Sequence, residues 1–129
     1  MNAKLIDGRA IANTIKTRVK DRIAERTENG LIPPGLSVIL VGDNPASKTY
    51  VTHKQRACTE VGIVSQCHTL PDDVSQKELV ALIQTLNQDP KTQGILLQLP
   101  LPSQLNADDL LEKISPQKDV DGFHPYNLG

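Results

Sequence analysis

Apolar and polar positions follow two different periods along the chain, one typical of helices and the other of strands. Over 8–29, apolar residues recur about every fourth position, which predicts a helix with one apolar face. Asp7 is placed to cap the start of this helix and Gly30 to end it. The run LSVILV at 36–41 is bounded by glycines and predicts a short buried strand. The apolar face of the first helix consists of Ile11, Ile15, Val19 and Ile23.

The rest of the chain continues to alternate the two patterns. Pro45 is suited to the first turn of a second helix, with Asn44 or Ser47 as its candidate cap. Ser75, followed three residues later by Glu78, forms a capping box that opens a third helix. The predicted segments are helices at 46–61, from Ser75 to about Gln88 and at 107–114, strands at 63–70 and 94–99, and a loop at 118–129.

This order of elements predicts a three-layer αβα fold with a parallel sheet. Strands that alternate with helices are joined by right-handed crossovers, which place helices on both faces of the sheet. A length of 129 residues fits one such domain. Ligands of open parallel sheets collect at the carboxyl ends of the strands. Three segments of unusual composition are expected to meet there, namely VGDNPASKTY, QLPLP and KDVDGFHPYN.

Composition and charge exclude several classes of function. A net charge of −1 and an aromatic fraction of 2% offer neither a basic stripe nor a stacking platform for nucleic acid. Two cysteines are too few for a disulfide framework or a zinc site. The sequence has no signal peptide, no membrane-length apolar run and no G-x-G-x-x-G turn. These features predict a soluble, cytoplasmic protein.

Two polar side chains stand out as candidates for chemistry in the middle of the chain. Tyr50 and Lys54 lie four residues apart and share one face of a helix, where they could orient a ring and carry a proton. The alternative is a surface lysine beside a half-buried tyrosine. Gln98 lies within an apolar run, and a buried carboxamide must be paired. It could bond to a catalytic side chain or satisfy a loop, and the sequence leaves both readings open.

A third candidate lies in the tail. Asp119 and Asp121 are two residues apart, so both could face one way and bind a cation or the amino edge of a heterocycle. The alternative is a simple turn at Asp121-Gly122. No third acidic ligand or histidine follows at the spacing of a metal site, so no metal is predicted.

Four segments, in this order, resemble the bifunctional methylenetetrahydrofolate dehydrogenase/methenyltetrahydrofolate cyclohydrolase family. They are IDGRAIA at 6–12, VGDNPASKTYVTHKQRACTEVGI at 41–63, GILLQLPLP at 94–102 and KDVDGFHPYNLG at 118–129. The resemblance implies NADP-dependent oxidation of 5,10-methylenetetrahydrofolate to the 5,10-methenyl form. It also implies hydrolysis of that form to 10-formyltetrahydrofolate, within one-carbon metabolism and purine biosynthesis.

The resemblance also implies roles for single residues. Lys54 is the expected catalytic residue of the hydrolysis, and Gln98 is expected to bond to it and hold it. Asp121 is expected to accept hydrogen bonds from the pterin. The folate pocket is expected to include Tyr50, which is also a catalytic candidate, together with Leu99, Pro100 and Ser47.

On this resemblance, the chain is the catalytic half of a two-domain enzyme whose Rossmann-type half is absent. Residues 1–117 are expected to form the tetrahydrofolate-binding domain, and 118–129 a substrate-binding loop and the start of a linker. The NADP site would lie in the other domain, through which the parent enzyme is expected to form a homodimer. Two alternatives remain: a folate-binding half-site without turnover, and a small α/β interaction domain.

Overall fold

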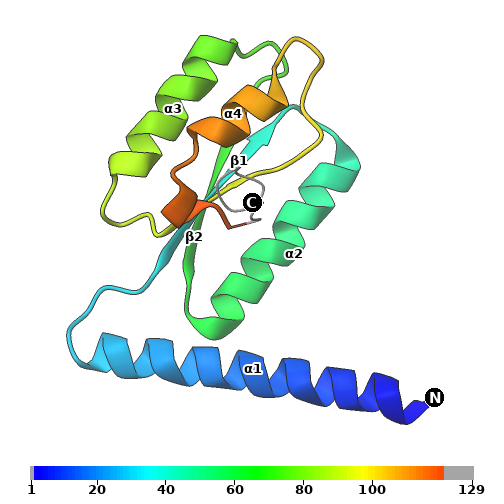
Figure 1. Ribbon diagram of the computed structural model, residues 1–129, viewed down its shortest axis with the longest axis vertical. Helices are drawn as coiled ribbons and strands as arrows, with labels where there is room; N and C mark the ends of the chain where they lie inside the picture. Colours follow the sequence, from blue (N-terminus) through cyan, green and yellow to red (C-terminus); the bar gives the residue numbers. More distant parts are fainter. Residues whose placement is uncertain (1, 121–129) are drawn as a thin grey trace.

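The computed structural model describes the backbone of residues 2–120 and the side chains from residue 14 onward (Figure 1). In chain order, its elements are α1 (Asn2–Glu28), β1 (Gly35–Val41), α2 (Pro45–Val61), β2 (Val64–Leu70), α3 (Gln76–Gln88), β3 (Gly94–Leu97), α4 (Ala107–Lys113) and a short 3-10 helix, η1 (Pro116–Lys118).

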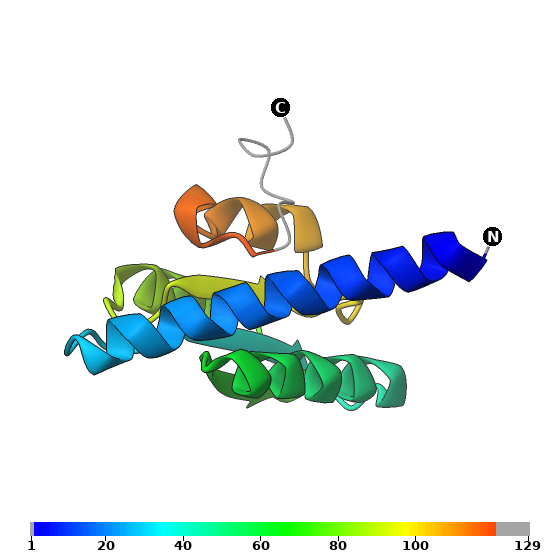
Figure 2. The same cartoon turned by 90° about the horizontal axis from the view of Figure 1, so that it is seen from below.

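A parallel sheet with strand order β2-β1-β3 forms the middle layer. β1 pairs with β2 from Gly35↔Val64 to Val41↔Leu70, and with β3 from Leu36↔Gly94 to Ile39↔Leu97. α3 and α4 lie on one side of this sheet and α2 lies on the other (Figure 2). The predicted three-layer αβα fold with a parallel sheet is therefore confirmed.

Alternation along the strands divides the core into two clusters. Ile39 and Val41 of β1 face α3 and α4, whereas Val38 and Leu40 face α2. The larger cluster, on the α3 and α4 side, includes Leu79, Ile83, Ile95, Leu97, Leu110 and Ile114. The smaller cluster, on the α2 side, adds Val51 and Leu96.

Local capping follows the sequence closely. At the start of α2, the Asn44 side chain accepts a hydrogen bond from the Ser47 backbone N–H at 3.1 Å, so Asn44 rather than Ser47 is the cap. The Ser75 hydroxyl accepts a bond from the Glu78 N–H at 3.1 Å, as the capping box predicts. Gly62 ends α2 at a φ of 91°, a conformation that costs glycine little.

Two predicted boundaries are wrong. α1 begins at Asn2 rather than at residue 8, with Asp7 inside it, because the preceding Ala-Lys-Leu segment consists of good helix formers. β3 ends at Leu97 rather than at residue 99. Pro100 and Pro102 follow, and a residue that lacks an N–H cannot extend the hydrogen-bond ladder.

The predicted apolar face of α1 is only partly covered. Ile23 is buried against Gly62, where an added Cβ would lie 3.0 Å from its Cγ2. Ile15 and Val19 remain 55% and 39% exposed. An ion pair between Lys16 and Glu60 also joins α1 to α2, and the Lys16 ammonium lowers the pKa of the Glu60 carboxyl. No helix within residues 2–120 is long and apolar enough to span a bilayer.

Candidate active site

Gln98 is placed by the strand that precedes it. Leu96 belongs to the core cluster on the α2 side, so Gln98, two residues later, points to the same side. Its backbone N–H still donates to the carbonyl of Ile39 at 3.0 Å, which continues the strand pairing by one step. The side chain is 7% exposed and must therefore find partners inside the protein.

The Gln98 carboxamide has a partner at each end. Its Oε1 accepts a hydrogen bond from Lys54 Nζ at 3.0 Å, and its Nε2 donates to the Leu99 carbonyl at 2.9 Å. The sequence left open whether Gln98 bonds to a catalytic side chain or satisfies a loop. It bonds both to Lys54, the catalytic candidate, and to the loop carbonyl of Leu99. Because the loop carbonyl takes the amide N–H, the amide oxygen is turned toward the lysine.

Lys54 lies on the side of α2 that faces the sheet. Ser47, Val51 and Cys58 are buried on this side, and Lys54 falls between them at helical spacing. Its side chain is half-buried, with the amine held by Gln98. Burial raises the pKa of the Cys58 thiol, so this neighbour stays protonated and is not a nucleophile.

The other predicted site residues differ in how exposed they are. Tyr50, one turn before Lys54, is 58% exposed and so more open than a half-buried tyrosine. Ser47 is 2% exposed, and its hydroxyl has no hydrogen-bond partner. After Gln98, Leu99 is half-buried and Pro100 is exposed, with a cis peptide bond between them. Asp121 lies outside the described residues.

The loops at the carboxyl edge of the sheet are tied to one another. The Gly42 N–H, just after β1, donates to the carbonyl of Leu70 at 2.9 Å. Gly42 has a φ of 85°, and a Cβ added there would collide with the Asp72 carboxylate. The side chain of Gln104, which follows β3, donates to the Asp72 carbonyl. These contacts join the ends of all three strands at one edge. Of the three segments predicted to meet there, VGDNPASKTY leads into α2, whose Lys54 contacts Gln98 of QLPLP, whereas the described start of KDVDGFHPYN lies beside Ile95 near the beginning of β3.

The arrangement is suited to proton transfer. An amine that donates one N–H to a fixed acceptor keeps its lone pair, when neutral, for a proton taken from elsewhere. Within residues 14–120, no three His, Cys, Asp or Glu side chains form a group that could hold a metal ion. The Leu99 carbonyl that fixes Gln98 escaped the sequence analysis, because backbone acceptors leave no pattern in a sequence.

Comparison with known proteins gives a consistent result. The family model described as tetrahydrofolate dehydrogenase/cyclohydrolase, catalytic domain, matches residues 6–121. A bifunctional methylenetetrahydrofolate dehydrogenase/cyclohydrolase from Campylobacter jejuni is 50% identical, with a TM-score of 0.90 over 95% of this chain and 43% of that one.

Two further solved structures are similar. A 5,10-methylenetetrahydrofolate dehydrogenase from the silkworm Bombyx mori is 41% identical, with a TM-score of 0.87 over 93% of this chain and 41% of that one. A methylenetetrahydrofolate dehydrogenase-cyclohydrolase from Trypanosoma brucei, complexed with NADP and an inhibitor, is 34% identical, with a TM-score of 0.87 over 95% and 41%. The chain spans less than half the length of each of these structures.

Proposed function

The chain belongs to the tetrahydrofolate dehydrogenase/cyclohydrolase family, and on that premise we propose that it binds a tetrahydrofolate and hydrolyses 5,10-methenyltetrahydrofolate to 10-formyltetrahydrofolate. The hydrogen bond of 3.0 Å between Lys54 Nζ and Gln98 Oε1 is the observation that carries the proposal. It presents an oriented, half-buried amine beside the carboxyl edge of the sheet, where ligands of parallel α/β folds collect.

The proposed chemistry uses Lys54 as a general base. The methenyl carbon is a cationic electrophile, so a neutral amine is accommodated beside it more easily than an ammonium. As the oxygen of a water molecule bonds to this carbon, its proton moves to Lys54 Nζ. Cleavage of the bond from that carbon to N5, with transfer of the remaining hydroxyl proton to N5, then leaves the formyl group on N10. Lys54 releases the proton it took up to solvent. The overall reaction consumes one water and releases one proton.

Gln98 would hold the amine through this cycle. Its oxygen can accept a hydrogen bond from Lys54 in either protonation state, and its own N–H is occupied by the Leu99 carbonyl. As an uncharged acceptor, it orients the amine without the strong preference for the ammonium that a carboxylate would impose.

The remaining pocket residues are proposed to bind the folate. Asp121 would accept hydrogen bonds from the pterin amino edge, which would orient the one-carbon unit. Tyr50, with an exposed phenol, is available to pack on a ligand ring, and the unpaired Ser47 hydroxyl is available for a polar contact. Leu99 and Pro100 would form the floor of the pocket.

The oxidation requires hydride transfer to NADP, which the hydrolysis does not. NADP would need a phosphate-binding turn, and the described residues do not fit it: β1 is followed by a lone Gly42, without the further glycines that let a backbone approach a phosphate. We therefore derive no NADP-dependent step from this chain. The proposal is that its folate site also serves the NADP-dependent oxidation of 5,10-methylenetetrahydrofolate, in a homodimer.

Loss of the methenyltetrahydrofolate chromophore, without a nicotinamide cofactor, tests the proposed hydrolysis. Lys54→Ala should reduce the protein-dependent rate by about 10²–10⁴-fold, because it removes the base. Lys77→Ala is the matched control, since this lysine is exposed on α3. It should keep the rate of the wild type.

The same experiment addresses the alternative of a half-site without turnover. The folded wild type could bind tetrahydrofolate in a calorimetric titration while the chromophore is lost no faster than in a protein-free blank. That result would contradict hydrolysis by this chain and support the folate-binding half-site. If neither turnover nor binding is observed, the proposed function fails altogether.

A further inference from the structure

A cavity of about 270 Å³ lies at the amino edge of the sheet, at the opposite end of the strands from Lys54 and Gln98. Its walls come from the segment before β1, from the first residues of β1 and β2, and from the loop between α3 and β3 (Figure 1). A protein cavity of roughly 150 Å³ holds benzene, and ordinary ligand pockets begin at about 300 Å³. The cavity is therefore large enough for a small organic molecule.

The loop at 89–93 forms one wall and is fixed to the start of β1. The Gly35 N–H donates to Gln93 Oε1 at 2.6 Å, and the Gln93 N–H donates to the Gly35 carbonyl at 2.9 Å. A Cβ added to Gly35 would collide with the carbonyl oxygen of Lys91, so the loop approaches as closely as only a glycine allows. This wall is therefore formed without any ligand.

The most buried residues of the lining, Ser37 and Thr92, present only hydrogen-bond acceptors to the cavity. They are 2% and 4% exposed, and their hydroxyl oxygens lie 3.3 Å apart. The Thr92 hydroxyl donates its single proton to the Asp89 carboxylate at 3.3 Å, so Ser37 must be the donor to Thr92. Because both hydroxyl protons are used in this way, a ligand that contacts these oxygens must supply the donors.

The Asp89 carboxylate also lines the cavity, and within residues 14–120 it forms no ion pair. Two lysines lie near it. Lys118 Nζ donates at 3.0 Å to the backbone carbonyls of Leu86 and Asp89, and Lys91 is exposed to solvent. Hydrogen bonds from a charged donor to a carboxylate are stronger than those between neutral groups. A positively charged donor therefore suits this side of the cavity best.

The opposite side of the lining is apolar. Ile32 and Val64 are 62% and 52% exposed, and Pro33 lies beside Ile32 in the segment before β1. An apolar group placed against these side chains would remove their exposed surface from water, which is favourable in proportion to the area covered. The lining thus combines acceptors and a negative charge with an apolar wall.

We propose that this cavity is a binding site for a small organic ammonium ion with an apolar body. The body would lie against Ile32 and Val64, and the N–H groups would donate to the hydroxyl oxygens and to the Asp89 carboxylate. The site lies at the opposite edge of the sheet from Lys54, so the inference does not depend on the proposed hydrolysis. Failure of either one leaves the other unchanged.

An NMR titration of the isotope-labelled chain with phenethylamine at neutral pH tests the site. Saturable shifts are expected at the amides of Val64, Lys91 and Thr92, with little change at Lys54. Phenethyl alcohol, which lacks the charge, should bind about tenfold more weakly, and phenylacetate should not bind. Shifts confined to other parts of the chain would overturn the inference. So would an alcohol or a carboxylate that binds as tightly as the amine.

Substitution of Asp89 tests the role of its charge. Asp89→Asn keeps an oxygen that can accept from the Lys91 N–H at the 2.9 Å seen for the carboxylate, and it should raise the Kd for phenethylamine at least tenfold. Asp73→Asn is the matched control, because Asp73 is exposed in the turn before α3 and outside the cavity, and it should leave the Kd unchanged. Equal Kd values for these two variants would overturn the inference.

A second variant keeps the test decisive if Asp89→Asn does not fold. Ser37→Ala removes one acceptor from the cavity and leaves the bond between Thr92 and Asp89 in place. It should raise the Kd for phenethylamine several-fold, whereas a Kd equal to that of the wild type would contradict the proposed site.

Discussion

Lys54 and Gln98 form a hydrogen-bonded pair, with the lysine amine as donor and the Gln98 amide oxygen as acceptor. The Gln98 carboxamide is buried and satisfied at both ends, so its oxygen stays directed at the lysine amine. An amide is neutral at all accessible pH values, whereas a carboxylate at this place would favour the charged lysine. In the proposed mechanism, the identity of this acceptor therefore affects how much neutral Lys54 amine is present near neutral pH.

We predict that Gln98→Glu moves the pH dependence of hydrolysis to higher pH. A carboxylate near Nζ favours the ammonium over the neutral amine, so less base is present at a given pH. The protein-dependent rate at pH 7 should fall by about tenfold and recover toward alkaline pH. Chromophore decay measured across pH would show this shift. A profile that is lower at all pH values but not shifted would contradict it.

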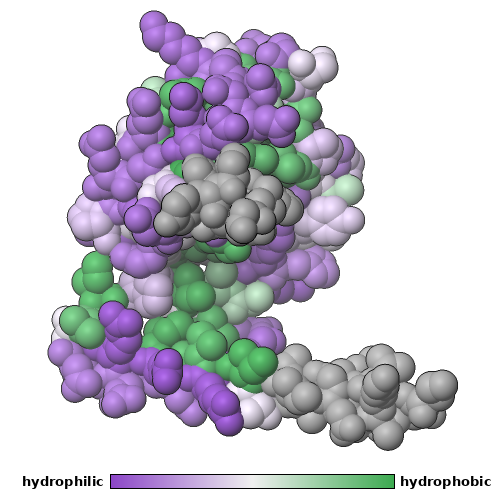
Figure 3. All heavy atoms as spheres, in the orientation of Figure 1, coloured by the Kyte–Doolittle hydropathy of each residue, from purple (hydrophilic) through white to green (hydrophobic). Residues whose placement is uncertain are grey.

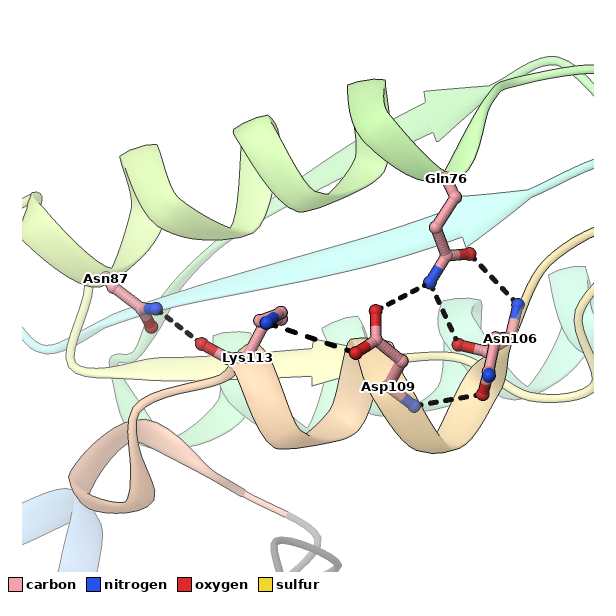
Figure 4. A network of polar contacts seen from close by, with 5 residues as sticks. All are labelled: Gln76, Asn87, Asn106, Asp109 and Lys113. Atoms are coloured by element: carbon pink, nitrogen blue, oxygen red, sulfur yellow. Dashed lines mark hydrogen bonds and ion pairs between the residues drawn. The ribbon is translucent and has the colours of Figure 1, made fainter.

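At the scale of elements, α4 depends on its attachment to α3. It has seven residues, which is too short for a helix to be stable on its own. Gln76 of α3 holds its first turn through three bonds (Figure 4). The Gln76 Oε1 accepts from the Asn106 N–H at 2.9 Å, while Nε2 donates to the Asn106 carbonyl at 3.3 Å and to the Asp109 carboxylate at 3.0 Å. With Asn87 at the other end, α3 clamps α4 at both of its termini.

Gln76→Ala should therefore lower the free energy of unfolding by about 1–3 kcal/mol, because it removes three hydrogen bonds between α3 and the start of α4. Urea denaturation would measure the change. Gln88→Ala, at the exposed last position of the same helix, is the control and should stay within about 0.5 kcal/mol of the wild type. Equal losses for the two variants would show that the clamp contributes nothing.

At the scale of the whole molecule, apolar side chains near α1 are exposed to solvent. Apolar side chains gather where α1 faces the sheet in Figure 3. On α1 and in the loop that follows it, the exposed large apolar side chains are Ile15, Val19, Leu31 and Ile32. Exposed apolar patches promote association of proteins in solution. The chain spans less than half the length of the solved structures it matches.

We predict that this chain self-associates at high concentration and that Ile15→Glu combined with Val19→Glu suppresses the association. Both side chains are exposed, so the charges should cost little stability. Sedimentation velocity over a range of concentrations would measure the effect. Ile23→Glu is the contrasting variant, because Ile23 is buried and its replacement should destabilise the fold. Identical sedimentation of the wild type and the double variant would contradict the prediction.

The sequence by itself determined the layers of the fold and singled out the residues of the candidate site. Strand and helix periods, with caps such as Asn44 and Ser75, specify local structure through contacts within a few residues, and these are readable in order along the chain. Motif resemblance likewise singled out Lys54 and Gln98, although their roles in turnover remain predictions.

Only the tertiary structure decided which groups meet across long separations. The orientation of the Gln98 amide depends on the Leu99 carbonyl, and the cap that Lys118 places on α3 joins residues about thirty positions apart. The partial exposure of α1 also depends on what packs against it. Such contacts form only when the layers pack together, and they use backbone carbonyls that every residue carries. They therefore cannot be predicted from a pattern of residue types.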